Sequence, residues 1–68
     1  MATTKTVTRM KQRRQQLRLT QQDVGYLARV SQADICRIET KRLVPGTRQA
    51  EKIGKVLKLD PAELQKPA

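Results

Sequence analysis

The sequence predicts a single all-α domain, and three observations support this. Its 68 residues suffice for one domain only. Tyr26 is the sole aromatic residue, whereas Leu, Ile, Gln, Lys and Arg are common, a composition that favours helices over sheets. The stretches TQQD at Thr20 and SQAD at Ser31 each have the pattern of a helix N-terminus. We therefore expect a compact bundle of five short helices.

A first helix is expected over residues 8–18, after a short polar arm at residues 1–8 that we predict to be flexible. Met10, Arg14 and Leu17 recur at spacings of four and three, which places them on one face of this helix. Only half of that face is apolar, so most of the charged side chains in the segment must point to solvent.

A second helix is expected over residues 21–28. The Thr20 hydroxyl can accept a hydrogen bond from an amide of the first turn, and the Asp23 carboxylate can accept one from the Thr20 amide. The helix then has an apolar stripe that must meet a core, formed by Val24, Leu27 and Ala28.

A third helix is expected over residues 32–40, with Ser31 as its cap and Asp34 as the partner of that cap. Ile35 and Ile38 should point inward. The turn between the second and third helices has only about three residues, so the two helices cannot lie antiparallel along their length. They should cross steeply, as in a helix-turn-helix.

A loop with the sequence KRLVPG precedes a fourth helix, expected over residues 47–58. The apolar face of that helix consists of Ala50, Ile53, Val56 and Leu57. An aspartate followed by proline then predicts a short fifth helix over residues 61–65, which packs Leu64. Residues 66–68 should fray, so the folded domain is expected at residues 9–65.

The charge of the chain is strongly positive and indicates a polyanionic partner. Fifteen Lys and Arg against six Asp and Glu give a net charge of +9, and no acidic residue precedes Asp23. Such a field attracts nucleic acid or an anionic membrane. No segment has the apolar length of a signal peptide or a membrane span, so we expect a cytoplasmic protein that does not enter a membrane.

Enzymatic and metal-dependent functions have no support in the sequence. There is no histidine, and Cys36 is the only cysteine, so there is neither a zinc set nor an internal disulfide. Paired carboxylates at a useful spacing and a glycine-rich phosphate loop are also lacking. We therefore expect no catalytic activity and no cofactor.

The predicted helix-turn-helix indicates binding to double-stranded DNA. In such a unit the second helix enters the major groove with its first residues at the base edges. Gln suits adenine, Arg suits guanine, and an alanine methyl suits the thymine methyl. The side chains expected to contact bases are Gln32, Ala33 and Arg37.

The register of these residues resembles the Cro-like and phage-repressor-like helix-turn-helix family, also called the Xre family. The resemblance rests on Arg14, Leu19, Thr20, Gln21, Val24, Val30, Ser31, Ile35, Ile38, Glu39, Pro45, Ile53 and Leu57. It implies a five-helix, lambda-repressor-like domain with the helix-turn-helix at helices 2 and 3. The chain departs from the family pattern at Arg29, where a turn glycine is usual, at Gly25, where alanine is usual, and at Thr40 and Lys41, where Asn-Gly is usual.

The same resemblance implies contacts to the DNA backbone. Gln21 would contact one phosphate and brace the third helix. Thr47 and Arg48 would hold a second phosphate, and Lys41 and Arg42 would add contacts to the backbone beside it. Ser31 is first a cap, with phosphate contact as an added role. Arg14 and Glu39 match a structural ion pair of the family.

The function expected from these features is a repressor-like transcriptional regulator of bacterial or phage origin, associated with the nucleoid. A domain this small buries little surface on DNA, so a homodimer on a palindromic operator is expected. The alternative is an antitoxin or coactivator-like module that binds a protein partner and DNA only secondarily. Whether the remaining N-terminal cations reach DNA or only aid solubility stays open; they are Lys5, Arg9, Lys11, Arg13 and Arg18.

Overall fold

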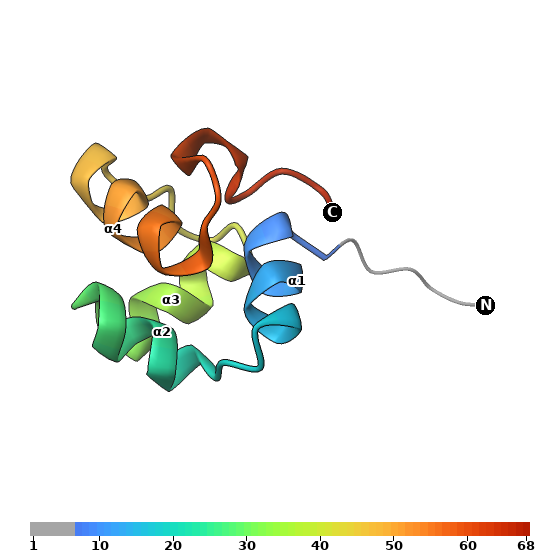
Figure 1. The fold of residues 1–68 in the computed structure, drawn as a ribbon. Coiled ribbons are helices and arrows are strands. Elements are labelled where there is room, and N and C mark those ends of the chain that lie inside the picture. The colour runs from blue at the N-terminus through green and yellow to red at the C-terminus, as the bar shows by residue number, and fades with distance from the viewer. Residues whose placement is uncertain (1–6) are drawn as a thin grey trace.

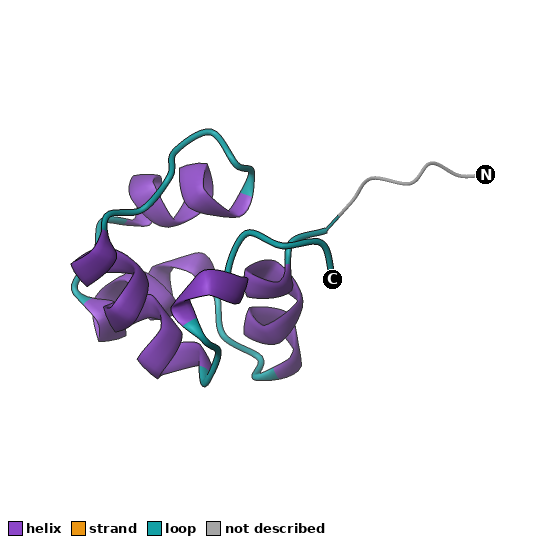
Figure 2. Ribbon diagram, turned by 90° about the horizontal axis from the view of Figure 1, so that it is seen from above, coloured by secondary structure: helices purple, strands orange, loops and turns teal. Residues whose placement is uncertain are grey.

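The computed structural model describes residues 7–68, which form the all-α domain that the sequence predicts (Figure 1). Within that range the order is α1 (Arg9–Gln16), α2 (Gln21–Ala28), α3 (Gln32–Glu39), α4 (Thr47–Leu57) and a single 3-10 turn, η1 (Pro61–Glu63). Loops join the helices, and the described residues contain no strand (Figure 2).

The prediction of a fifth helix over residues 61–65 is wrong, because this segment forms only the 3-10 turn η1. Asp60 caps this turn as predicted, by accepting a hydrogen bond from the Ala62 amide. The Leu64 and Lys66 amides, however, donate to the Pro61 and Glu63 carbonyls, three residues back, which is the spacing of a 3-10 turn and not of an α-helix. The fold therefore has four α-helices among its described residues.

The core forms where α2 packs against α3 and α4, and where α4 also meets η1 and α1. The side chains without exposed surface include Met10, Val24, Ile35, Ile38, Ile53 and Leu57, and Leu64 of the last segment is 1% exposed. Leu19, Val30, Leu43, Val56 and Leu59 pack against this core and are half-buried. Burial of each large side chain contributes about 1.5–3 kcal/mol, which is substantial for so small a domain.

Two of the expected core positions are wrong. Leu17 is 39% exposed because α1 ends at Gln16, one residue before it. Leu27 is 55% exposed because α2 buries Val24, Gly25 and Ala28, so its inner face is rotated toward Gly25. The apolar spacing of α2 alone does not distinguish these two orientations.

The two ends of the described chain lie side by side (Figure 1). Thr8 is buried, caps α1 by accepting a hydrogen bond from the Lys11 amide, and pairs with Pro67. The Ala68 amide donates to the carbonyl of Val7 at 2.9 Å. The packed unit therefore extends beyond residues 9–65 at both ends. Most of the arm predicted over residues 1–8 lies outside the described residues, and the fraying of residues 66–68 stays a prediction.

Each α-helix is followed by a basic residue in the left-handed conformation. These residues are Arg18, Arg29, Lys41 and Lys58, with φ between 57° and 62°. After each of them the next amide donates back to the helix, for example Leu19 to Arg14 at 3.0 Å and Leu59 to Gly54 at 2.9 Å. The positive side chains suit the negative ends of the helix dipoles, although a β-carbon disfavours this conformation.

A buried polar cluster around Glu39 joins the first three helices. Arg14 donates to both carboxylate oxygens of Glu39, through Nε at 2.6 Å and a terminal nitrogen at 3.3 Å. Gln21 donates to the same carboxylate at 3.0 Å, and Thr8 donates to the Glu39 carbonyl at 3.3 Å. The Glu39 side chain is 1% exposed. The expected pair of Arg14 and Glu39 is thus present in the structure and buried.

Replacing Arg14 by methionine should lower the free energy of unfolding by about 3–5 kcal/mol, because the Glu39 carboxylate is left buried without its cation. Chemical denaturation of the variant measures this. The double variant Arg14→Met/Glu39→Leu is the control, since removal of both charges should restore most of the loss. A loss below about 0.5 kcal/mol for the single variant, typical of a surface change, would contradict the role of the pair.

Candidate nucleic-acid interface

α2 starts with the capping box that its sequence predicts. The Thr20 hydroxyl accepts from the Asp23 amide at 3.0 Å, and the Asp23 carboxylate accepts from the Thr20 amide at 2.9 Å. These hydrogen bonds to Thr20 hold the pKa of Asp23 below its ordinary value. The Asp23 contribution to stability is therefore present at neutral pH and disappears only as the pH falls through this lowered pKa.

The turn between α2 and α3 depends on a close approach of two backbone segments. Arg29, at the position where the resembled family usually has a turn glycine, is in the left-handed conformation with φ 58° and ψ 45°. The Val30 amide donates to the Gly25 carbonyl at 2.9 Å, and a β-carbon on Gly25 would meet the Val30 carbonyl oxygen at 2.6 Å. Gly25 therefore allows the close approach on which the turn depends.

α3 separates an inner face from an outer one. Ile35, Ile38 and Glu39 are buried, and the exposed positions are Gln32, Ala33, Cys36, Arg37 and the cap residue Ser31. The Ser31 hydroxyl accepts from the Asp34 amide at 3.1 Å. The whole outer face of the third helix is thus open to a ligand.

Asp34 turns away from the expected reciprocal cap and contacts its neighbours instead. Its carboxylate accepts from Arg37 at 3.4 Å and from Gln49 of α4 at 3.5 Å. The contact with Arg37 is long and the Arg37 side chain is 59% exposed, so the arginine remains available to a ligand. Asp34 therefore orients Arg37 weakly while it joins α3 to α4.

Gln21 lies at the first position of α2 and is half-buried. Its side-chain amide donates to Glu39 at the last position of α3. This is the bracing contact expected from the family resemblance. It sets the start of α2 against the end of α3.

The N-terminus of α4 differs from those of α2 and α3. Its cap residue is Gly46, and no side chain accepts a hydrogen bond from its first turn. Within residues 7–68 the amides of Thr47, Arg48 and Gln49 have no acceptor, whereas Ala50 donates to the Gly46 carbonyl. Such amides at the positive end of a helix dipole favour an anion. The glycine before Thr47 was the sequence signal for this site.

The other residues expected at the interface, together with the N-terminal cations, divide into two groups. Thr47, Arg48, Lys41 and Arg42 are exposed at the start of α4 and in the loop before it. Arg9 pairs with Glu63 at 2.6 Å, and Arg13 donates to the Leu57 and Lys58 carbonyls at 3.2 Å. Arg9 and Arg13 thus hold the C-terminal segment, while Lys5 lies outside the described residues.

The geometry of the described residues gives no support to a metal site or a membrane-spanning helix. Within residues 7–68 no three His, Cys, Asp or Glu side chains come together as a metal site. In that same part of the chain, no helix has the length and apolar content needed to cross a bilayer. Cys36 is a free, exposed thiol on α3.

A family model described as a helix-turn-helix domain matches residues 7–66, nearly the whole chain. The chain belongs to this family. Neither the curated proteins nor the solved structures compared with it gave a match. Membership in the helix-turn-helix family agrees with the two capped helices and short turn described above, and it indicates DNA as the partner of this domain.

Replacing Arg29 by glycine should raise the free energy of unfolding by about 0.5–1 kcal/mol, because glycine adopts the left-handed conformation without the penalty of a β-carbon. Thermal and chemical denaturation measure the change. Arg29→Ala is the matched control, since it removes the same charged side chain but keeps the β-carbon. Equal stability of the two variants would show that the conformation of the turn carries no such penalty.

Replacing Gly25 by valine should destabilise the domain by about 1–3 kcal/mol, because the new side chain meets the backbone of the turn. Gly46→Val is the control: a β-carbon on Gly46 has no atom within 4 Å and its backbone is extended. Denaturation of both variants by urea measures the difference. If Gly25→Val were as stable as the control, the close approach would not constrain the turn.

Proposed function

We propose that this domain is a sequence-specific, repressor-like transcriptional regulator of the Cro-like and phage-repressor-like (Xre) group. The observation that carries the proposal is the exposed N-terminal face of α3 in a helix-turn-helix. Gln32, Ala33 and Arg37 are all exposed on this helix. With α3 in the major groove, Gln32 pairs with adenine, Arg37 with guanine, and Ala33 contacts a thymine methyl.

The proposed affinity comes from phosphate contacts on both sides of α3. The amides at the start of α4, which have no acceptor within residues 7–68, bind one phosphate together with Thr47 and Arg48. Lys41 and Arg42 extend this contact through the loop before α4. Gln21 and Ser31, at the starts of α2 and α3, contact the backbone on the other side.

The proposed assembly is a homodimer on a palindromic operator. A single helix-turn-helix of this size buries little surface on DNA, and a two-fold dimer places two α3 helices about 34–36 Å apart, one turn of the duplex. A bacterial or phage regulator in the cytoplasm, associated with the nucleoid, fits this assembly. The proposal assigns no catalytic reaction and no cofactor to the chain.

A second candidate is an antitoxin or coactivator-like module with secondary DNA binding. It is favoured by apolar exposure on α2, where Tyr26 is 82% exposed and Leu27 is 55% exposed. Neighbouring exposed apolar side chains mark interaction surfaces more often than scattered ones do. The same surface also suits the second subunit of a homodimer, so it does not separate the two candidates. Sequence-specific binding to DNA does.

Selection from a pool of random duplex DNA at about 150 mM salt tests the regulator, because added salt suppresses non-specific phosphate contacts. A palindromic consensus is the expected result, and its half-site spacing gives the geometry of the dimer. Sequences without a consensus, bound with an affinity that vanishes as salt rises, would reject the regulator in favour of the second candidate.

Variants of the interface should separate base contacts from phosphate contacts. Gln32→Ala and Arg37→Ala should each weaken binding to the selected operator by about 1–3 kcal/mol and leave binding to random DNA nearly unchanged. Arg48→Ala should weaken both and flatten the dependence on salt. Titrations by fluorescence anisotropy over a range of salt measure these effects. Equal losses on operator and random DNA for Gln32→Ala would contradict its contact with a base.

A further inference from the structure

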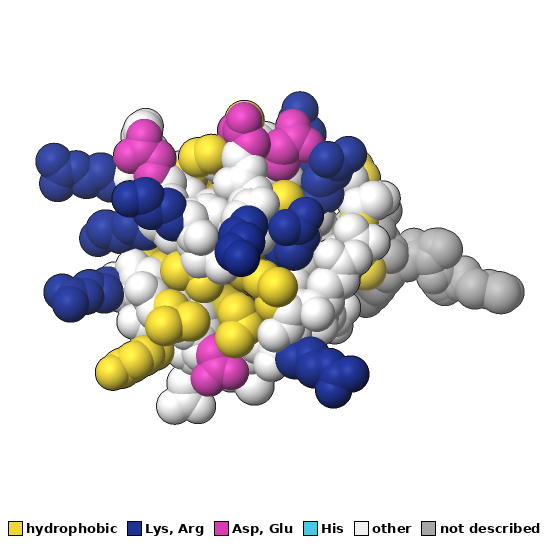
Figure 3. Space-filling view, viewed as in Figure 1, with side chains coloured by type: hydrophobic (Ala, Val, Ile, Leu, Met, Phe, Trp, Pro, Cys, Tyr) yellow, Lys and Arg dark blue, Asp and Glu magenta, His cyan; other side chains and the backbone are white. Residues whose placement is uncertain are grey.

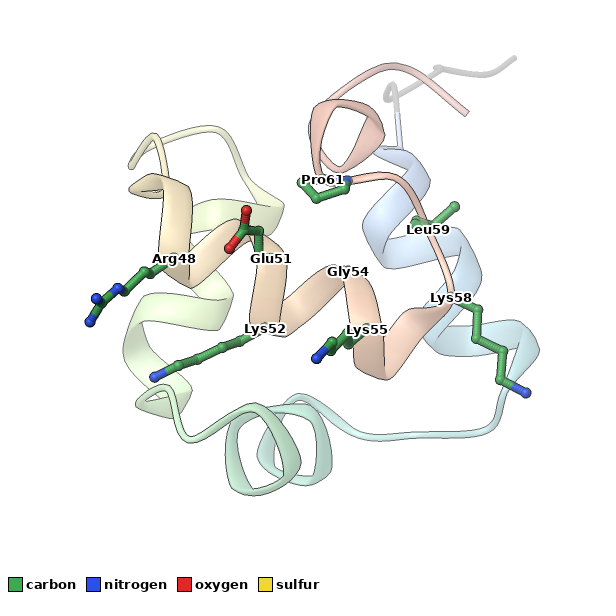
Figure 4. A pocket seen from close by; sticks show the side chains of 8 residues that line it. All are labelled: Arg48, Glu51, Lys52, Gly54, Lys55, Lys58, Leu59 and Pro61. Atoms are coloured by element: carbon green, nitrogen blue, oxygen red, sulfur yellow. The ribbon is translucent and has the colours of Figure 1, made fainter.

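A hollow of about 410 Å³ runs along the outer side of α4 (Figure 4). Its apolar lining comes from Gly54, Leu59 and Pro61. A β-carbon on Gly54 would meet the Leu59 carbonyl oxygen at 2.6 Å and Pro61 at 3.5 Å, so the glycine allows this segment to lie against the helix. The volume is within the range of about 300–1,000 Å³ that is usual for binding sites.

Four cations border the hollow, and they come from one side of α4 and its end. Arg48, Lys52 and Lys55 follow each other at spacings of four and three, which places them on one face, and Lys58 follows the last turn. Figure 4 shows Arg48 and Lys52 extending to the same side of the helix. The space-filling view shows an apolar area with Lys and Arg side chains above it and to its left (Figure 3).

None of these four cations stabilises the fold through an ion pair within residues 7–68. All four are exposed. Like charges at such spacings repel each other and destabilise a helix slightly. Glu51 is the one acidic residue that lines the hollow. The cluster is therefore complementary to a ligand with several negative charges.

The combination of an apolar lining and a cationic border specifies the ligand further. A DNA backbone presents phosphates but no side chain for the apolar lining, whereas an acidic amphipathic protein segment presents both carboxylates and apolar side chains. A second copy of this chain is a poor ligand, because it carries a net charge of +9. Of its acidic residues, Glu39 is buried, and Asp34 and Glu63 form ion pairs with cations.

We propose that this hollow docks an acidic amphipathic segment of a partner protein. Leucine-sized side chains of the segment fill the apolar lining, and its carboxylates contact Lys52, Lys55 and Lys58. The site is separate from the outer face of α3, so the proposal does not rest on sequence-specific DNA binding. Arg48 borders the hollow and also belongs to the proposed phosphate contact, so it is left unchanged in the test.

Two peptides and two double variants test the docking site on the full chain. The first peptide has about 15 residues, with leucines at helical spacing and glutamates elsewhere, and the second replaces the leucines by glutamine at the same charge. Lys52→Ala/Lys55→Ala removes two cations at the hollow. Lys41→Ala/Arg42→Ala removes two cations of the proposed DNA contact and serves as the matched control.

Calorimetric titration at about 150 mM salt, with amide chemical shifts measured in parallel, gives the outcome. The leucine peptide should bind, shift the amides of residues 52–61, and lose about tenfold in affinity with Lys52→Ala/Lys55→Ala but not with the control. Absence of binding, equal binding of the glutamine peptide, or equal losses in both double variants would overturn the proposal. Duplex DNA as a third ligand keeps the two functions distinct, because the control variant should weaken DNA binding whatever the peptides do.

Discussion

The buried carboxylate of Glu39 is the interaction on which the arrangement of the helices depends. It accepts hydrogen bonds from Arg14 of α1 and Gln21 of α2, and it lies at the last position of α3. A carboxylate at 1% exposure requires these partners, because an unpaired buried charge is strongly destabilising. Arg14 also donates to the Leu19 carbonyl, so the same cluster sets the link between α1 and α2.

This cluster positions the surface that is proposed to meet DNA. With the end of α3 held against α1 and α2, Gln32, Ala33 and Arg37 stay exposed on the outer face. Asp34 joins this helix to Gln49 of α4, where no side chain caps the first amides within residues 7–68. The positive charge of the chain serves structure and binding together: Arg13 and the left-handed cations lie at helix C-termini, whereas Arg48 borders the candidate interfaces.

Local patterns predicted the helices well because caps and turns depend on neighbouring residues. The Thr20 capping box and the Ser31 cap are confirmed. Burial was predicted less well. Leu27 has the right spacing for the core but is exposed, since the direction in which α2 packs depends on the close approach at Gly25. The contacts assigned to Gln32 and Arg37 stay predictions of the same sequence patterns, now with both side chains placed on an exposed face.

The sequence by itself determined the all-α class, the start of each α-helix, and the helix-turn-helix, because these follow from hydrogen bonds and spacings within a few residues. The tertiary structure decided what residues far apart in the chain do together. It showed that Arg13 caps the end of α4, that Thr8 is buried beside Pro67, and that Gly54 brings Pro61 against α4. Such contacts depend on how the helices pack, and local spacing carries no information about the partner that a side chain meets across the core.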